Sequence, residues 1–286
     1  MARTRYIQAG SAIAAAGIAM LLLMPAPAPV GAPTAQAATI AAKRLQQLAD
    51  GPQRSADNKA RDRVRNPVPV LSFFKVTPRD RVIEILPGSA GYWTEILAPY
   101  LSERGQYVAA IPKVNPDRPE SVKSAAEFRA KLSTDPINYG RVATVDFASD
   151  APDFGMPGSV DAVLTFRNLH NWLAAGKAEQ VIAAFHKVLR KGGVLGIEEH
   201  RARADQPQDP AAKSGYVRED YAIALIEKAG FRFAGKSEIN ANPRDTKDYA
   251  AGVWTLPPVY RLKDQDREKY TAIGESDRFV MKFVKR

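Results

Sequence analysis

The segment VIEILPGSAGYWTEILAPYL, residues 82–101, decides the fold. It begins with an apolar run that contains one carboxylate, Glu84, turns at Pro87-Gly88, and then takes the pattern of a helix. A buried strand, a glycine turn and a helix in this order are typical of the nucleotide-binding end of a Rossmann-type sheet. The glycines do not fit a dinucleotide fingerprint, which would need glycine at Leu86 as well as at Gly88 and Gly91. The segment predicts a ligand-binding turn and leaves the ligand open.

The rest of the chain repeats this alternation of strand and helix. Short apolar runs separated by amphipathic segments predict βαβ units and a parallel sheet buried on both faces. The expected strands are 81–86, 107–111, 142–147, 160–166, 193–199, 231–239 and 278–286, and the expected helices are 68–74, 92–104, 120–132, 177–189 and 219–229. We therefore expect an α/β protein with a Rossmann-like, doubly wound, mostly parallel sheet and helices on both faces.

The N-terminus has the pattern of a secretory signal peptide. Arg3 and Arg5 precede an apolar run from about residue 9 to 24, and Ala35-Gln36-Ala37 forms a cleavage site. The run is shorter than the about 20 residues that a membrane-spanning helix needs. We expect cleavage after Ala37, a periplasmic location and no stable membrane span; a retained anchor is the alternative. The chain then divides into a signal peptide (1–37), an N-terminal helical segment (38–66) and a Rossmann domain (67–286) with an insertion at 240–277.

Composition restricts the chemistry. The chain has 286 residues, a formal net charge of +10 and no cysteine, which excludes disulfides, thiolate nucleophiles and Cys-ligated metals. Basic and acidic residues are interspersed without a Lys/Arg run, so we expect no nucleic-acid partner. An excess of positive charge instead suits an anionic small molecule, lipid or cell-wall polymer. The oligomeric state does not follow from the sequence.

Polar residues follow several of the expected strands, at the edge where an open α/β sheet binds its ligands. They are Asp146-Phe147 after the third strand, RNLHNW (167–172) after the fourth and EEHR (198–201) after the fifth. If the fourth and fifth strands are neighbours, His170 and His200 open onto the same cleft. Arg167 would then lie close enough to pair with Glu198 or Glu199.

Three segments resemble class I S-adenosylmethionine-dependent methyltransferases in order and spacing. VIEILPGSAGYWTEIL resembles their first motif, DAVLTFRNLHNW their fourth strand, and VLRKGGVLGIEEH the turn and fifth strand. The terminal RFVMKF resembles the antiparallel last strand of their seven-stranded sheet, so the resemblance covers about residues 67–286. More narrowly, the chain resembles an exported branch of predicted methyltransferases, with which it shares the Pro-Gly turn, Arg-x-x-His-x-Trp, GYVREDY (215–221) and GESDRF (274–279).

This resemblance implies S-adenosylmethionine as the cofactor and assigns the first turn to its amino-acid part. Glu84 would position the turn and contact that part, and Pro87 would stiffen the turn. Gly88 and Gly91 would let the backbone approach the cofactor, since glycine has no Cβ.

The resemblance also assigns the adenosine part. Asp146 would accept a hydrogen bond from the adenine amino group, and Phe147 would lie against the ring. The family usually carries an acid at the end of the second strand for the ribose hydroxyls, and here that position is Ile111. Its loss removes two charge-assisted hydrogen bonds, so the sequence predicts weak or altered cofactor binding.

The segment after the fourth strand would border the methyl acceptor. We expect His170 as the general base and His200 or Arg167 as the residue that orients an anionic or phenolic small molecule. The first interpretation is thus a methyltransferase with no metal. The alternative is a methyltransferase-fold protein that has lost S-adenosylmethionine, in which His170, His200 and Glu198 or Glu199 bind another ligand or a divalent metal.

Overall fold

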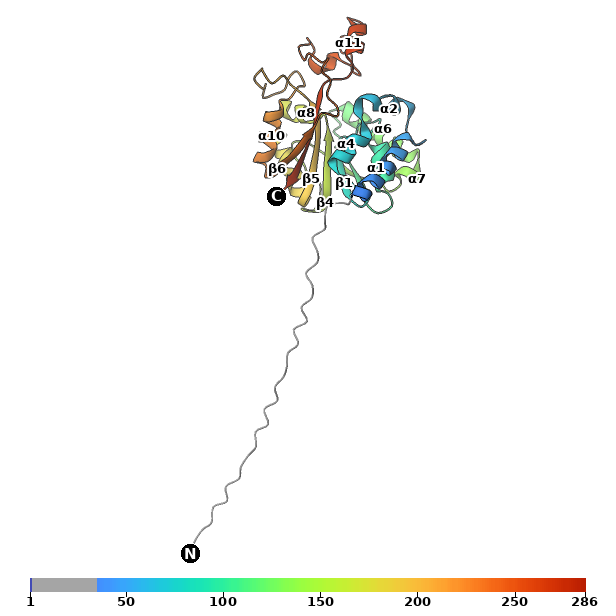
Figure 1. The fold of residues 1–286 in the computed structure, drawn as a ribbon, viewed down its shortest axis with the longest axis vertical. Coiled ribbons are helices and arrows are strands. Elements are labelled where there is room, and N and C mark those ends of the chain that lie inside the picture. Colours follow the sequence, from blue (N-terminus) through green and yellow to red (C-terminus); the bar gives the residue numbers. More distant parts are fainter. Residues whose placement is uncertain (2–34) are drawn as a thin grey trace.

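The computed structural model describes Met1 and residues 35–286 and shows a doubly wound α/β architecture (Figure 1). In this part of the chain seven strands form one sheet, in the order β3-β2-β1-β4-β5-β7-β6. They are β1 (Arg81–Ile85), β2 (Gln106–Pro112), β3 (Ala143–Phe147), β4 (Val160–Phe166), β5 (Leu189–His200), β6 (Phe231–Ser237) and β7 (Arg278–Lys285). β7 is antiparallel to both its neighbours, and the other pairings are parallel. The predicted sheet is confirmed.

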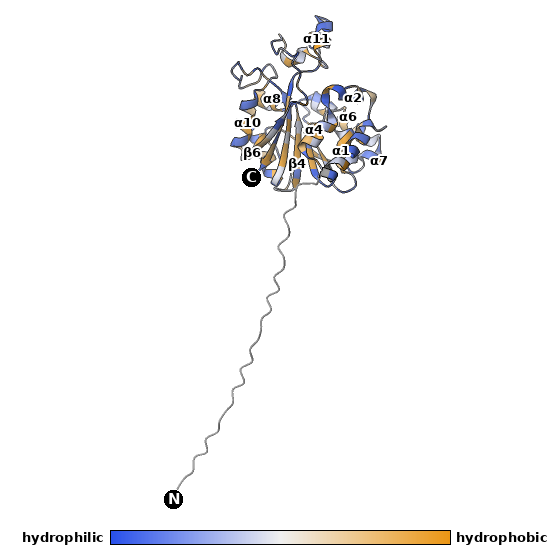
Figure 2. Cartoon of the chain, in the orientation of Figure 1, coloured by the Kyte–Doolittle hydropathy of each residue, from blue (hydrophilic) through white to orange (hydrophobic). Residues whose placement is uncertain are grey.

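Helices cover both faces of this sheet. They are α1 (Ala35–Asp50), α2 (Ala56–Ala60), α3 (Asp62–Arg65), α4 (Pro67–Phe74), α5 (Thr94–Leu101), α6 (Pro119–Ser133), α7 (Pro136–Tyr139), α8 (Leu169–Ala174), α9 (Ala178–Val188), α10 (Glu219–Lys228), α11 (Arg267–Ile273) and the 3₁₀ helix η1 (Gly252–Thr255). Successive residues of a strand point to opposite faces, so Val82 packs with α1, α4 and α5, and Ile83 with α8, α9 and α10. In Figure 2 hydrophobic residues gather on the central strands and hydrophilic ones on the periphery.

Two helices, α1 and α8, are not among those expected from the sequence, and one strand begins earlier than expected. The N-terminal segment contains the 16-residue helix α1 as well as the two short helices α2 and α3. The segment after β4 forms α8 because Leu169, Trp172 and Leu173 place apolar side chains on one helical face, where they are buried. β5 begins at Leu189, four residues earlier than predicted, since Leu189 pairs with Val160 ahead of a register shift.

The insertion between β6 and β7 is ordered around η1 and α11, and α11 lies away from the sheet (Figure 1). The GYVREDY motif holds part of it in place. Tyr216 donates a hydrogen bond to Asp245 at 3.0 Å. Gly215 has φ +80°, and a Cβ there would lie 2.4 Å from Val253 Cγ1, so only glycine allows η1 to approach this closely.

The predicted signal peptide lies almost entirely outside the described residues, and α1 begins at Ala35. Signal cleavage and export therefore stay predictions. Within the part of the chain that the structure describes, no helix has the length and apolar character needed to cross a membrane. The N-terminal helical segment packs onto the sheet unit, with Leu45 and Leu48 of α1 buried in the same core as α4 and α5.

Candidate active site

A cavity of about 380 Å³ lies where the carboxyl ends of β1, β4 and β5 meet the insertion. Its volume is within the range of small-molecule sites, about 300–1,000 Å³. The lining residues come from α3, the β1 turn, the segment after β4, the end of β5, η1 with the residues after it, and the GESDRF motif: Arg65, Leu86–Gly88, Phe166–Asn168, His170, Asn171, His200, Val253, Trp254, Pro257–Val259, Glu275 and Ser276. The position agrees with the rule that ligands bind beyond the carboxyl ends of parallel strands.

The turn after β1 reaches this cavity through Leu86, Pro87 and Gly88. Gly88 has φ +71°, and a Cβ built on it would have no atom within 4 Å, so space is open above the backbone. Gly91 also has a positive φ, +56°, but a Cβ there would lie 3.0 Å from Lys131 Cε. The side chain of Lys131 therefore covers Gly91. Pro87 and Gly88 line the cavity, and Gly91 does not.

Glu84 lies on the α5 side of the sheet and is 1% exposed. Tyr107 donates a hydrogen bond to Glu84 Oε2 at 2.5 Å, and its hydroxyl lies 2.8 Å from Thr94 Oγ1. Burial raises the pKa of Glu84 to about 8, against smaller opposing effects of Tyr107 and Arg65. Through the hydroxyl of Tyr107, the carboxyl group of Glu84 links β1 to Thr94 of α5, rather than reaching a ligand above the turn.

The residues assigned to adenine and ribose lie apart from the cavity. The side chain of Asp146 is 57% exposed and its Oδ1 lies 3.5 Å from Arg129 Nη2. Phe147 is buried, with its ring centroid 5.7 Å from Phe154 in a stacked arrangement. Ile111 is fully buried and offers no hydrogen bond from its side chain. The ends of β2 and β3 thus provide packing and a surface ion pair, and the roles assigned to Asp146 and Phe147 stay predictions.

His170 and Glu199 form a buried pair at the start of α8. Glu199 is 0% exposed and accepts hydrogen bonds from His170 Nδ1 at 2.9 Å, from the His170 amide at 3.1 Å and from the His200 amide at 2.8 Å. Burial lowers the pKa of His170, but the Glu199 charge and hydrogen bond outweigh it and raise that pKa above its usual value. Because Nδ1 is held by Glu199, Nε2 is left for chemistry.

His200 lies beside His170, as predicted, with ring centroids 5.3 Å apart. Its Nδ1 is 2.6 Å from Ser276 Oγ. Burial, then the positive charges of His170 and of nearby arginines, hold the pKa of His200 well below its usual value. His200 is therefore a neutral imidazole at physiological pH. Trp254 of η1 closes this side, edge-on to His170 at 5.9 Å between centroids.

One ligand atom each from His170, Glu199 and His200 lie within 4.8 Å of one another, a spacing compatible with a metal ion. The electrostatics of this group are mixed. Glu199 raises the pKa of His170, whereas burial and then nearby positive charges lower the pKa of His200. Glu199 is in addition already engaged in three hydrogen bonds.

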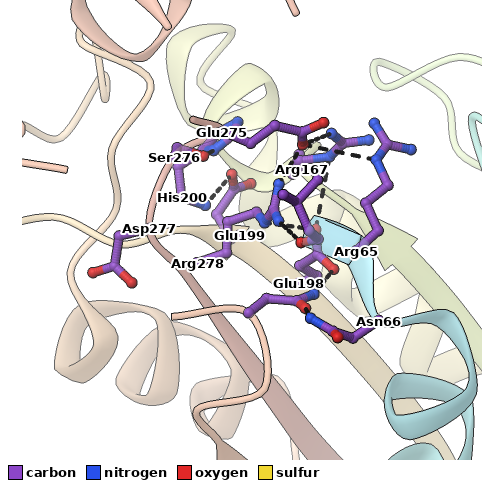
Figure 3. Close-up of polar contacts among 12 residues, drawn as sticks. Arg65, Asn66, Arg167, Glu198, Glu199, His200, Glu275, Ser276, Asp277 and Arg278 are labelled. Atoms are coloured by element: carbon purple, nitrogen blue, oxygen red, sulfur yellow. Dashed lines mark hydrogen bonds and ion pairs between the residues drawn. The ribbon is translucent and has the colours of Figure 1, made fainter. Parts of the chain in front are cut away.

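Four arginines and two glutamates form a cluster of ion pairs; Figure 3 shows three of these arginines and both glutamates near His200. Arg61 Nη2 and Arg278 Nη1 each lie 2.6 Å from Glu275, on different oxygens. Arg167 Nε lies 3.8 Å from Glu198, which confirms one of the two ion pairs predicted for it. The full set is Arg61, Arg65, Arg167, Arg278, Glu198 and Glu275.

Sequence reasoning missed Arg65, Glu275 and Ser276 as cavity residues. Glu275 and Ser276 belong to GESDRF, a motif that the sequence analysis noticed without giving it a role. Arg65 carried no signal, because it precedes the first strand and approaches the cavity only through the packing of α3.

Comparisons with known proteins agree on the architecture. No protein-family model matches the chain, and no curated protein matches it. Among solved structures, the [4+2]-cyclase SpnF shares 14% identity over 87% of this chain and 94% of its own, with a TM-score of 0.55. The glycopeptide N-methyltransferase MtfA complexed with sinefungin shares 12% identity over 77% and 93%, with a TM-score of 0.51. A methyltransferase from Methanosarcina mazei, described as dependent on S-adenosylmethionine, shares 13% over 76% and 97%, at 0.50.

The chain has the class I methyltransferase fold. That fold also carries a cyclase, so the reaction must be argued from the site. For S-adenosylmethionine, the open turn at Gly88 fits the amino-acid end. The adenosine end does not fit, because Ile111 lacks a polar group, Asp146 faces Arg129, and Phe147 is packed in the core.

Proposed function

We propose that the protein is an enzyme of the methyltransferase fold that acts on a small anionic or phenolic molecule in the cavity at the ends of β4 and β5. The observation that carries this proposal is the buried His170–Glu199 pair, whose histidine lines that cavity together with His200 and Arg167. A histidine oriented by a carboxylate is the arrangement of a general acid–base group.

The chain supplies each part that proton transfer needs. Glu199 fixes the tautomer of His170 so that Nε2 can take a proton from a ligand hydroxyl, and its charge stabilises the imidazolium that forms. His200 is neutral, and its Nδ1 is already paired with Ser276. It can orient the ligand through its second nitrogen without adding charge. Trp254 and the prolines after it line the cavity and give it an apolar wall.

Methyl transfer from S-adenosylmethionine is the second candidate. It is favoured by the open turn at Gly88, which lines the same cavity as His170. It would require contacts for the adenosine part other than those that the resemblance assigns. Acid–base chemistry on the acceptor is common to both candidates, and location in the periplasm stays part of the proposal.

A pair of glycine variants tests the second candidate. Gly88 and Gly176 have similar φ, +71° and +65°, and a Cβ on either would meet no atom within 4 Å. Gly88→Ala and Gly176→Ala therefore impose the same backbone strain, on the order of 1 kcal/mol. The first places it at the turn that lines the cavity, and the second places it away from the cavity. Calorimetric titration measures the affinity of each protein for S-adenosylmethionine. An affinity that Gly88→Ala weakens and Gly176→Ala leaves unchanged would support methyl transfer. No saturable binding at millimolar ligand would exclude it.

Glu199→Gln tests the acid–base pair without knowledge of the substrate. We expect the pKa of His170, measured by NMR, to lie above its usual value in the wild type and to fall below it in Glu199→Gln, because the charge is lost while burial remains. His186 of α9, which packs against Phe231, is the control, and its pKa should not change. Turnover of any substrate should fall about a hundredfold or more. An unchanged titration of His170 would refute the proposed pair.

A further inference from the structure

One wall of the cavity carries more positive charge than its carboxylates neutralise. In the part of the chain that the structure describes, four guanidinium groups share Glu198 and Glu275, an excess of two positive charges (Figure 3). Among the described residues Glu199 makes no ion pair with these arginines; its hydrogen bonds go to His170 and to the amide of His200. Buried charges are stable when they are paired, so an anion would be stabilised at this wall.

The arginines also have unused donors. Among the described residues, the Nε atoms of Arg65, Arg167 and Arg278 are buried without a hydrogen-bond partner. Arg65 is 4% exposed, and it lines the cavity together with Arg167. Burial, followed by the charge of Arg167, lowers the pKa of Arg65 to about 8. These Nε atoms face Glu275 or Glu198 at 3.3–3.8 Å, so a ligand in the cavity would meet the terminal nitrogens of Arg65 and Arg167, which make no hydrogen bond within the described residues. Buried polar groups in folded proteins nearly always find a partner, so these donors point to a ligand that supplies the acceptors.

The other two arginines hold this wall in place. Arg278 is 2% exposed and lies between Glu198, at 3.3 Å, and Glu275, at 2.6 Å. Arg61 binds the second oxygen of Glu275. Arg65 and Arg167 lie farther from Glu275, at 3.8 and 3.9 Å, beyond hydrogen-bond distance. The two arginines with the weakest internal pairing are thus the two that line the cavity.

We propose that Arg65 and Arg167 bind a doubly charged anionic group of the ligand, either a phosphate monoester or a dicarboxylate. Planar guanidinium groups bind phosphate and carboxylate oxygens through pairs of parallel hydrogen bonds. A dianion matches the excess of two charges, whereas a monoanion would leave one of them. This inference narrows the proposed function to one ligand class and rests on it, because it uses the same cavity.

Calorimetric titration of the full chain with inorganic phosphate, malonate and acetate tests the ligand class at pH 7.5 and constant ionic strength. We expect saturable one-to-one binding of phosphate or malonate, and binding of acetate at least about tenfold weaker, since one charge-assisted contact is worth roughly that factor. Preference for phosphate identifies a phosphate monoester, and preference for malonate identifies a dicarboxylate. No saturable binding of either dianion would overturn the inference.

Arginine variants locate the site. Arg65→Gln and Arg167→Gln should each weaken dianion binding by about tenfold to a hundredfold. Arg63→Gln is the matched control, because Arg63 is exposed on the same helix as Arg65 and its loss changes the net charge equally. Equal weakening in all three variants would mean nonspecific attraction and overturn the inference. If Arg65→Gln does not fold, the comparison of dianion binding between Arg167→Gln and Arg63→Gln still tests the site.

The two proposals fail separately. Loss of anion binding with a normal His170 titration would overturn the dianion site alone. An absent His170 shift with intact anion binding would overturn the acid–base role alone.

Discussion

Replacing Glu275 with glutamine is expected to lower the free energy of unfolding by about 3–5 kcal/mol, the usual cost of removing one partner from a buried ion pair. Glu275 is 8% exposed and accepts hydrogen bonds from Arg61 and Arg278. Without its charge, Arg61 and Arg65 would lose the carboxylate with which they pair, and only Arg167 and Arg278 would keep an ion pair, with Glu198. Urea unfolding at pH 7 measures the loss.

The pH dependence of this effect has a defined sign. Burial alone would raise the pKa of Glu275, but Arg278 and three further arginines lower it to about 2. A carboxyl group with a lowered folded-state pKa stabilises the protein above its unfolded pKa, and that stability is lost as the pH falls toward the folded value. The difference between wild type and Glu275→Gln should therefore be full above about pH 4.5 and shrink toward pH 2.

Two further variants make the test specific. Glu127→Gln removes an exposed carboxylate that pairs with Lys123 at 3.7 Å, and it should change stability by less than about 0.5 kcal/mol. Adding Arg65→Gln to Glu275→Gln should restore part of the loss, since it removes one of the uncompensated charges. A Glu275→Gln protein as stable as the Glu127→Gln control would contradict the charge balance derived for this wall.

The sheet was predictable because each of its strands has a recognisable local sequence pattern. Segments such as RVIEIL and VDAVLTF are short apolar runs between amphipathic stretches, and burial on both faces produces that pattern. α8 was not predictable from such a pattern. Its six residues mix Leu169, Trp172 and Leu173 with polar residues, and one and a half turns are too short to show a helical period.

The site was predictable where strand order alone positions a residue. His170 and His200 follow strands that are neighbours in the sheet, so topology brings them together. Arg61 and Glu275 are separated by 214 residues, and no local pattern encodes their contact. The orientation of Glu84 could have been inferred, because residues two apart in a strand share a face, and Val82 is a core residue of the α5 side.

Glu84→Gln is expected to stabilise the protein at alkaline pH. Burial raises the pKa of Glu84 from about 4.5 to about 8, so folding keeps a proton that the unfolded chain releases over that range. For a carboxyl group with a raised folded-state pKa, stability is full below the unfolded pKa and decreases as the pH rises toward the folded value. The shift corresponds to a decrease in the free energy of unfolding on the order of 4 kcal/mol by pH 8. The uncharged amide of the glutamine variant avoids this decrease.

Denaturant unfolding of wild type and Glu84→Gln between pH 5 and pH 8.5 measures this effect. The two proteins should be similar in stability at pH 5 and diverge as the pH rises, with the variant the more stable. Glu103→Gln, an exposed carboxylate with a side chain 72% accessible, controls for the change in net charge and should follow the wild type. Tyr107→Phe removes a hydrogen bond that favours the ionised form of Glu84, so the decrease of its stability should continue to a higher pH than in the wild type. Parallel pH profiles for wild type and Glu84→Gln would mean that Glu84 is ionised in the folded protein, and a charged Glu84 beneath the Pro87-Gly88 turn would restore the cofactor role that the resemblance assigns to it.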